Sequence, residues 1–124
     1  MKILFICCGN MFRSQVAEAL FNRVKDEGID VMSCGTWVEK ESLIGKKLKD
    51  FDGHNTLWDL RNLIEVMKEK DIDISENICK PITLELVSWA DKVISIAEED
   101  ESPEYLINSS KVIFWKVGNS QQPY

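Results

Sequence analysis

An apolar strand that runs directly into a short polar turn and then a helix is the feature that most constrains this chain. Residues 2–7 form an apolar run of strand length, and Gly9 and Asn10 follow at once. Apolar residues then recur at the spacing of one helix face, at Val16, Ala17, Leu20, Phe21 and Val24. We expect Gly28 to end this helix. A strand, a turn and a helix therefore follow one another at the start of the chain.

The rest of the chain continues the alternation of strand and helix. Further strands are predicted at residues 29–34, 92–97 and 111–115. Helices are predicted at 56–67 with Thr56 as the N-cap, at 84–89 with Thr83 as the N-cap, and from Ser102-Pro103 onward. Residues 37–55 and 71–75 are expected to connect these elements. The order predicts an α/β fold with three layers, in which a four-stranded parallel sheet is flanked by helices.

The length and charge of the chain limit its function. Its 124 residues suffice for one domain with one core, which we place at 1–124. The formal net charge of −6 disfavours binding to nucleic acid or to an anionic membrane, so any anion site has to be local. The apolar run at the N-terminus is too short for a signal sequence or a membrane span. We therefore expect a cytoplasmic protein whose four cysteines are reduced.

The turn between the first strand and the first helix has the composition of an anion site. Parallel sheets bind ligands beyond the carboxyl ends of their strands, which is where Cys7 and Arg13 lie. A loop of this length can direct its N–H groups around a tetrahedral oxyanion, and the helix N-terminus adds partial positive charge. Gly9 is expected to supply a positive φ, with Asn10 the next most tolerant residue. Arg13 supplies a planar guanidinium for two oxygens.

The same surroundings favour the thiolate form of Cys7. Backbone N–H groups, the guanidinium and the hydroxyl of Ser14 would all stabilise a charged sulfur. Such a nucleophile can attack the phosphorus of a bound ester and form a thiophosphate that water then cleaves. The alternative interpretation is that Cys7 and Cys8 are small buried residues at a strand end, where free cysteines are common.

The order of residues in this turn resembles the signature of a known enzyme family. Residues 6–19, ICCGNMFRSQVAEA, are similar to the signature of the low-molecular-weight protein tyrosine phosphatases, a family that includes thioredoxin-coupled arsenate reductases. Weaker similarities follow in Ser33-Cys34-Gly35-Thr36, Asp71-Ile72-Asp73-Ile74-Ser75 and Ala90-Asp91-Lys92-Val93-Ile94. Together they extend the resemblance along most of the chain.

The resemblance implies a fold of the phosphotyrosine protein phosphatase I type and assigns roles to the turn. Cys7 would be the nucleophile, Arg13 the phosphate clamp and Ser14 a helper, with Asn10 holding the shape of the loop. Inorganic phosphate or sulfate would lie in the loop formed by Cys8, Gly9, Asn10, Met11, Phe12, Arg13 and Ser14. The partner would be a phosphorylated protein or a small aryl phosphate. No metal and no cofactor is implied.

Two parts of the family pattern lack a clear counterpart. The family's general acid is an aspartate before a proline, in a loop after the last strand, where this chain carries Asn119 or, in a shifted alignment, Gln122. Since an amide cannot protonate a leaving group, Asp100 or Glu99 would have to act from the neighbouring strand end, and turnover is expected to be weak. The usual C-terminal helix is also lacking. One sheet face near the fourth strand is then expected to be exposed, to be covered by a second copy in a homodimer or by another partner.

Three functions remain open from the sequence. The first is a cysteine-dependent phosphatase of phosphotyrosine or small aryl phosphates, with reduced activity because the acid is missing. The second is an inactive relative that binds phosphate or a phosphorylated protein. The third is an arsenate reductase that uses a partner thiol. For the third, only Cys34 and Cys79 lie downstream of the turn, and neither lies in the acidic loop after the third strand.

Overall fold

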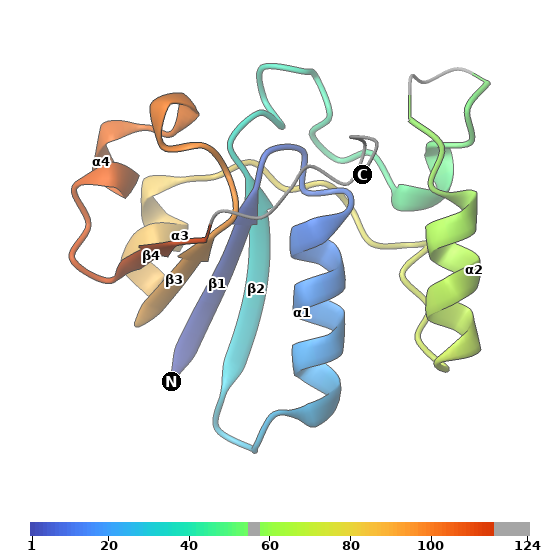
Figure 1. Ribbon diagram of the computed structural model, residues 1–124, viewed down its shortest axis with the longest axis horizontal. Coiled ribbons are helices and arrows are strands. Elements are labelled where there is room, and N and C mark those ends of the chain that lie inside the picture. The colour runs from blue at the N-terminus through green and yellow to red at the C-terminus, as the bar shows by residue number, and fades with distance from the viewer. Residues whose placement is uncertain (55–57, 116–124) are drawn as a thin grey trace.

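The computed structural model describes residues 1–54 and 58–115, which form an α/β fold around one parallel sheet (Figure 1). The strands are β1 (Lys2–Cys7), β2 (Asp30–Gly35), β3 (Lys92–Ser95) and β4 (Val112–Phe114), in the spatial order β2-β1-β3-β4. The helices are α1 (Arg13–Val24), α2 (Arg61–Glu69), α3 (Leu84–Trp89) and α4 (Glu104–Ile107), and 3₁₀ turns occur at η1 (Leu48–Asp50) and η2 (Glu99–Glu101). The predicted parallel sheet flanked by helices is confirmed.

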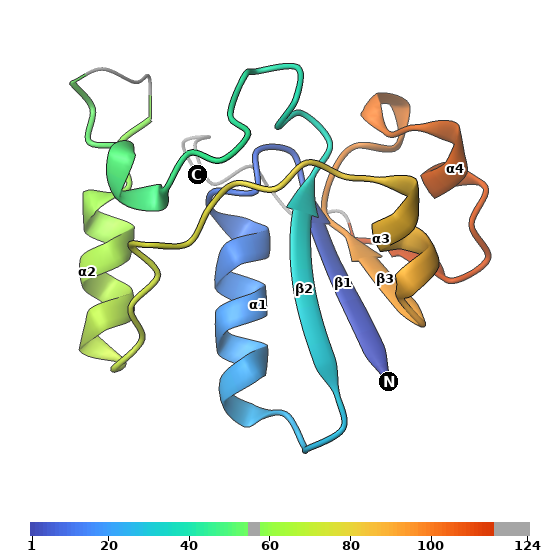
Figure 2. The same ribbon diagram turned by 180° about the vertical axis from the view of Figure 1, so that it is seen from behind.

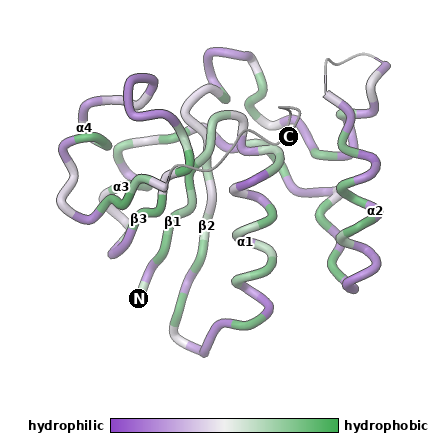
Figure 3. The backbone as a smooth tube through the Cα atoms, in the orientation of Figure 1, coloured by the Kyte–Doolittle hydropathy of each residue, from purple (hydrophilic) through white to green (hydrophobic). Residues whose placement is uncertain are grey.

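Helices cover both faces of the sheet, as Figures 1 and 2 show from opposite sides. Ile3 and Phe5 of β1 belong to the cluster beneath α1. Leu4 and Ile6 belong to the cluster on the opposite face, which includes buried residues of α3 and α4. Burial on both faces explains why β1 is apolar without alternation, and Figure 3 shows the strand as a largely hydrophobic segment.

A second layer of helix lies outside α1. Ile64 and Met67, the buried side chains of α2, join a large apolar cluster to which Val16 and Ala19 of α1 contribute. The long segment before α2 and the segment after it add further buried residues to this cluster. Within the described ranges, no helix is long and apolar enough to cross a membrane.

The predicted helix boundaries are only partly correct. The cap of α3 is confirmed, because the Thr83 hydroxyl accepts the Leu86 N–H at 3.1 Å. α1 ends earlier than expected, at Val24, and Gly28 instead forms a positive-φ turn before β2. The start of α2 at residue 56 is wrong, since the Leu60 N–H is donated to the Phe51 carbonyl at 2.7 Å and the helix begins only afterwards. The expected N-cap, Thr56, lies outside the described residues.

The strand predictions differ from the structure by one or two residues. β1 has the predicted bounds, and β2 lies one residue later than expected. β3 ends at Ser95 instead of residue 97, and β4 is confined to Val112–Phe114. The pairing of β3 with β1 and with β4 ends at Ser95, so both short strands stop there.

The face of the sheet near β4 is exposed, as the sequence predicts. Phe5, Ile94 and Ile113 are neighbours across β1, β3 and β4. The exposed fraction is 6% at Phe5, beneath α1, and 53% at Ile113, where α1 no longer reaches. Trp115, which follows β4, is exposed as well. A homodimer or another partner as the cover of this face stays a prediction.

The end of β2 lies directly against the turn that follows β1. The N–H groups of Thr36 and Trp37 donate to the carbonyls of Cys7 and Cys8 at 3.0 and 2.8 Å. A Cβ on Gly35 would lie 2.4 Å from the Cys8 carbonyl oxygen and 2.9 Å from the nitrogen of Asn10. Only glycine allows the two backbones to approach so closely.

Replacing Gly35 by alanine should therefore destabilise the protein through this contact. We expect Gly35→Ala to lower the free energy of unfolding by about 2–3 kcal/mol, because backbone atoms on both sides would have to move. Gly9→Ala is the matched control, since a Cβ there meets only the flexible end of the Met11 side chain. Urea denaturation of both variants measures the difference. Equal losses for the two variants would contradict the close-approach explanation.

Candidate active site

Cys7 lies at the end of β1, with hydrogen-bonding groups around its sulfur. Its Sγ is 2.9 Å from Ser14 Oγ, and the Asn10 backbone N–H donates to it at 3.2 Å. Cys7 is only 3% exposed, and Asn10 and Ser14 are fully buried. α1, which begins at Arg13, starts beside the end of β1 (Figure 1). The structure thus brings together three of the residues that the sequence places in one site.

The loop owes its shape to Asn10, which has a φ of +53°. The prediction that Gly9 supplies the positive φ is wrong, because Gly9 is not among the residues in that region. Asparagine tolerates the left-handed region, and its side chain also fixes the loop. Asn10 Nδ2 donates to Ser14 Oγ at 2.8 Å and to Ser33 Oγ at 2.9 Å, and Asn10 Oδ1 accepts the Lys80 N–H at 2.8 Å. A glycine could adopt the same φ but would make none of these side-chain bonds.

The N-terminus of α1 provides positive charge at the same place. No side chain caps its first turn, and that turn contains no acidic residue. Uncapped N–H groups at the start of a helix carry partial positive charge and suit an anion. Arg13, which is half-buried, adds a full charge, and no carboxylate of the described residues forms an ion pair with it. A local cationic site thus exists within a chain of negative net charge.

The other loop residues point in different directions. The Met11 side chain packs into the cluster shared with α2, so Met11 can contribute to an anion site only through its backbone. Phe12 is exposed next to the loop. Cys8 is half-buried and packs toward the face covered by α3. Binding of phosphate or sulfate by the loop stays a prediction.

Burial raises the pKa of three of the four free cysteines. It raises the pKa of Cys34 to about 12 and that of Cys79 to about 11, with nearby Cys7 adding to both shifts and Lys80 opposing them. Burial also raises the pKa of Cys8, Cys7 acts in the same direction, and the positive charge of Arg13 opposes it. Cys34 packs with Leu4 and Ile6, which places it on the opposite face of the sheet from Cys7.

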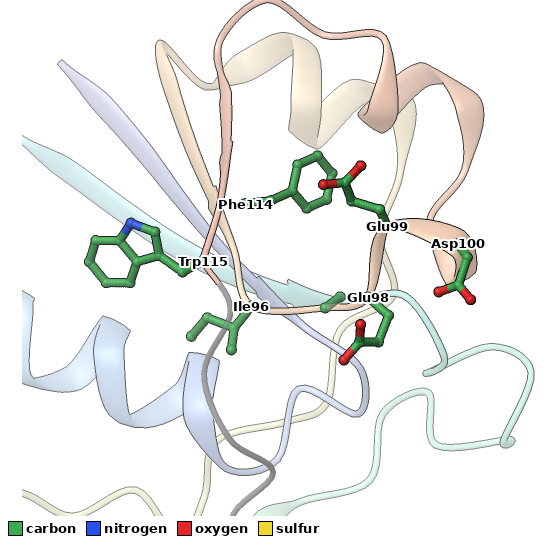
Figure 4. A pocket seen from close by; sticks show the side chains of 7 residues that line it. Ile96, Glu98, Glu99, Asp100, Phe114 and Trp115 are labelled. Atoms are coloured by element: carbon green, nitrogen blue, oxygen red, sulfur yellow. The ribbon is translucent and has the colours of Figure 1, made fainter.

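A cavity of about 480 Å³ opens at the carboxyl ends of β3 and β4 (Figure 4). It is lined by Ile96, Ala97, Glu98, Glu99, Asp100, Phe114 and Trp115. Both substitute acids proposed from the sequence, Glu99 and Asp100, therefore lie at the edge of the sheet that also carries Cys7. The Glu101 carboxylate raises the pKa of Cys8 and the Glu98 backbone lowers it, so this acidic segment lies near the loop.

The acidic side chains at this cavity do not converge on one point. The carboxylates of Glu98, Glu99 and Asp100 point away from one another in Figure 4. Asn119 and Gln122, which occupy the family's acid position in the two alignments, lie outside the described residues. Within residues 1–54 and 58–115, no three His, Cys, Asp or Glu side chains are grouped so as to hold a metal ion.

Three supporting residues were not assigned a role from the sequence. Ser33 lies in a segment that resembles the family pattern, and this resemblance could have indicated a role at the site. Gln15 is a fully buried polar residue directly after the Arg-Ser pair. Lys80 acts through its backbone N–H, which no side-chain pattern encodes.

Comparison with known proteins identifies the class that this fold and loop define. Residues 2–113 match the model of the family described as "Low molecular weight phosphotyrosine protein phosphatase". The chain belongs to this family, which includes phosphatases and arsenate reductases.

Individual relatives come from both branches of the family. An arsenate reductase of Staphylococcus aureus is 31% identical over 100 residues, which are 81% of this chain and 63% of that protein. A protein-arginine-phosphatase of Bacillus subtilis is 30% identical over 102 residues, 80% of this chain and 57% of that protein. The chain thus covers less than two thirds of the length of these curated relatives.

Solved structures of the family share the fold. Vibrio vulnificus Wzb in complex with benzylphosphonate superimposes with a TM-score of 0.63 at 28% identity, over 80% of this chain and 59% of that chain. A low molecular weight protein tyrosine phosphatase from Bacillus subtilis gives a TM-score of 0.63 at 26% identity, over 92% of this chain and 69% of that chain.

The cysteine environment predicts which thiols react in the folded protein. At about pH 8, Cys34 and Cys79 should resist alkylation by iodoacetamide, because both are buried and their raised pKa values keep them as neutral thiols. Both should become reactive once urea unfolds the chain. Peptide mass spectrometry after brief labelling measures this. Labelling of Cys34 in the folded protein at the rate seen in urea would contradict the structure.

Proposed function

We propose that this chain is a cysteine-dependent phosphatase that hydrolyses phosphotyrosine in proteins or small aryl phosphates. The observation that supports it most is the contact of the Cys7 sulfur with the Asn10 N–H and the Ser14 hydroxyl, beside the uncapped start of a helix that begins with Arg13. Each of these groups stabilises negative charge, either on the sulfur or on a bound phosphate.

In the proposed reaction, the phosphoryl group passes through Cys7. The thiolate attacks phosphorus in line, the bond from phosphorus to the ester oxygen breaks, and that oxygen leaves with the electron pair. Loop N–H groups and Arg13 balance the charge on the remaining phosphate oxygens. Water then attacks phosphorus, the S–P bond breaks, inorganic phosphate leaves, and the thiolate is restored. The Ser14 hydroxyl stabilises the sulfur as leaving group in this second step.

Two solved relatives support the chemistry by what they contain. One is a mutant of the YwlE arginine phosphatase, with cysteine changed to serine and a phosphorylated active site serine, 28% identical with a TM-score of 0.54. Wzb was solved with benzylphosphonate, a compound with an aromatic ring and a phosphonate. The first is consistent with a nucleophile that takes up the phosphoryl group, and the second with an aromatic group next to a phosphate.

The proposed activity depends on how basic the leaving group of the phosphate ester is. Without a positioned acid, an ester with a basic leaving group should react slowly, since general acid catalysis supplies roughly 10²–10⁴-fold. A phenolate such as p-nitrophenolate needs little protonation. Glu99 and Asp100, which line the neighbouring cavity, are the proposed substitutes.

An arsenate reductase is the second candidate, and the S. aureus relative favours it. That reaction needs further thiols to take up the oxidation of Cys7. Cys34 lies on the opposite face of the sheet and Cys79 is buried, so a thiol from a partner would be needed. The third hypothesis is a protein that binds phosphate but catalyses no reaction. Assay of p-nitrophenyl phosphate hydrolysis distinguishes it from the phosphatase.

Hydrolysis of p-nitrophenyl phosphate tests the proposal. We expect measurable release of p-nitrophenolate by the wild type, no release above background by Cys7→Ser, and a loss of about 10²–10³-fold for Arg13→Lys, which removes the planar pair of donors. Cys34→Ala is the matched control, because this cysteine lies on the other face of the sheet and its loss should leave turnover intact. Inorganic phosphate should inhibit the wild type competitively.

Three outcomes would overturn the proposal in different ways. Phosphate binding without release dependent on Cys7 would indicate a binding protein. Arsenite production with a thiol donor, and no phosphatase activity, would indicate the reductase. Hydrolysis of phosphoarginine in preference to aryl phosphates would place the protein with its arginine phosphatase relatives in substrate class.

A further inference from the structure

We propose that Gln15 is a positioning residue, whose carboxamide holds Asn10 in the left-handed conformation and thereby keeps the Asn10 N–H directed at the Cys7 sulfur. The inference rests on the proposed function, because it concerns the loop assigned to phosphate binding. Gln15 does not contact Cys7 in the structure, so it would act through Asn10 alone.

The Gln15 side chain is surrounded by carbonyl oxygens from two parts of the chain. Its Nε2 lies 3.1 Å from the Asn10 main-chain oxygen, 3.1 Å from Asn10 Oδ1 and 2.8 Å from the Ile78 oxygen. Its Oε1 accepts Asn77 Nδ2 at 3.2 Å. The two N–H bonds of the Gln15 carboxamide are thus shared among three oxygen acceptors, and its oxygen accepts from one donor.

The need for this donor follows from the backbone of Asn10. A residue at a φ of +53° leaves regular secondary structure, so its carbonyl oxygen has no strand or helix partner. Asn10 and Gln15 are both fully buried, so bulk water does not reach them. A buried carbonyl without a donor is costly, and Gln15 is the side chain that supplies the donor here.

Gln15 also connects the loop to the segment between α2 and α3. Asn77 and Ile78 bind its two ends, and the N–H of Lys80 donates to the same Asn10 Oδ1 that Gln15 contacts. The Gly35 N–H in turn donates to the Lys80 carbonyl at 2.9 Å, which ties the segment to the end of β2. Without the Gln15 carboxamide, Asn10 would lose the hydrogen bonds from Gln15, whereas the segment at Lys80 would stay bound to Gly35.

Two substitutions separate positioning from mere packing. Gln15→Met keeps the length and removes both the donor and the acceptor, and Gln15→Glu keeps the shape but, when ionised, faces carbonyl oxygens without a proton to donate. Val87→Ala is the control, because Val87 is buried in α3 on the opposite face of the sheet and its truncation lowers stability without removing any hydrogen bond of Gln15 or Asn10. All three are compared with the intact wild-type chain at matched folded fractions.

The measurements are the dissociation constant for inorganic phosphate, by titration calorimetry, and the exchange rate of the Asn10 amide hydrogen, by NMR. We expect each Gln15 variant to weaken phosphate binding by about tenfold and to speed Asn10 exchange by a similar factor, since a lost buried hydrogen bond of this kind shifts an equilibrium by that much. Val87→Ala should change neither quantity.

The possible results distinguish a failure of the positioning role of Gln15 from a failure of the proposed phosphatase function. Unchanged Asn10 exchange in a folded Gln15→Met or Gln15→Glu would overturn the positioning role, whatever the protein's activity. Faster exchange in a chain that neither binds phosphate nor hydrolyses p-nitrophenyl phosphate would support the role of Gln15 and overturn the proposed function. If Val87→Ala also weakened phosphate binding tenfold, the effect of the Gln15 variants would be explained by lost stability, and the positioning role would be wrong.

Discussion

The left-handed conformation of Asn10 is the constraint on which the rest of the site depends. A residue other than glycine in this region is disfavoured by roughly 1–2 kcal/mol, and each buried hydrogen bond contributes about 0.5–1.5 kcal/mol. Asn10 makes bonds through its backbone N–H, its main-chain carbonyl and both ends of its side chain, so the favourable contributions outweigh the strain. In this conformation the Asn10 N–H donates to the Cys7 sulfur at 3.2 Å.

The sheet supplies the fixed frame around this residue. β1 is the inner strand to which β2 and β3 both pair in parallel, so its end at Cys7 is held from both sides. Ser33 reaches Asn10 from β2, and the backbone at Gly35 packs against the loop. α1 begins where the loop ends and directs its uncapped N–H groups to the same point. The Cys7 sulfur, the Asn10 N–H and the Ser14 hydroxyl therefore meet at the start of the helix that Arg13 begins.

The sequence predicted the features that local chemistry encodes. The apolar run of β1 and the Thr83 cap are properties of neighbouring residues, and both were found as predicted. The clustering of Cys7, Asn10 and Ser14 followed from one short motif, and the structure brings them together. The parallel sheet followed from the alternation of strand and helix. The family resemblance that the motif suggested is confirmed by the match over residues 2–113.

The failures come from contacts between distant residues. Gly9 was assigned the positive φ because glycine tolerates it, yet Asn10 takes it because Ser33 and Lys80 hold its side chain from elsewhere in the chain. The start of α2 was placed too early because the bond from Leu60 to Phe51 closes a loop that no periodicity reveals. The role of Gln15 is not visible in the sequence, since two of its partners, Asn77 and Ile78, lie more than sixty positions away in the chain.

Trapping the covalent intermediate tests most directly whether this loop holds a phosphate over a reactive sulfur. The protein would be mixed with p-nitrophenyl phosphate, quenched in acid within the first turnover, digested and analysed by peptide mass spectrometry. A phosphoryl group on the peptide that contains Cys7, lost when inorganic phosphate occupies the loop first, is the predicted result. A protein that releases p-nitrophenolate while every cysteine stays unmodified throughout that turnover would contradict the account.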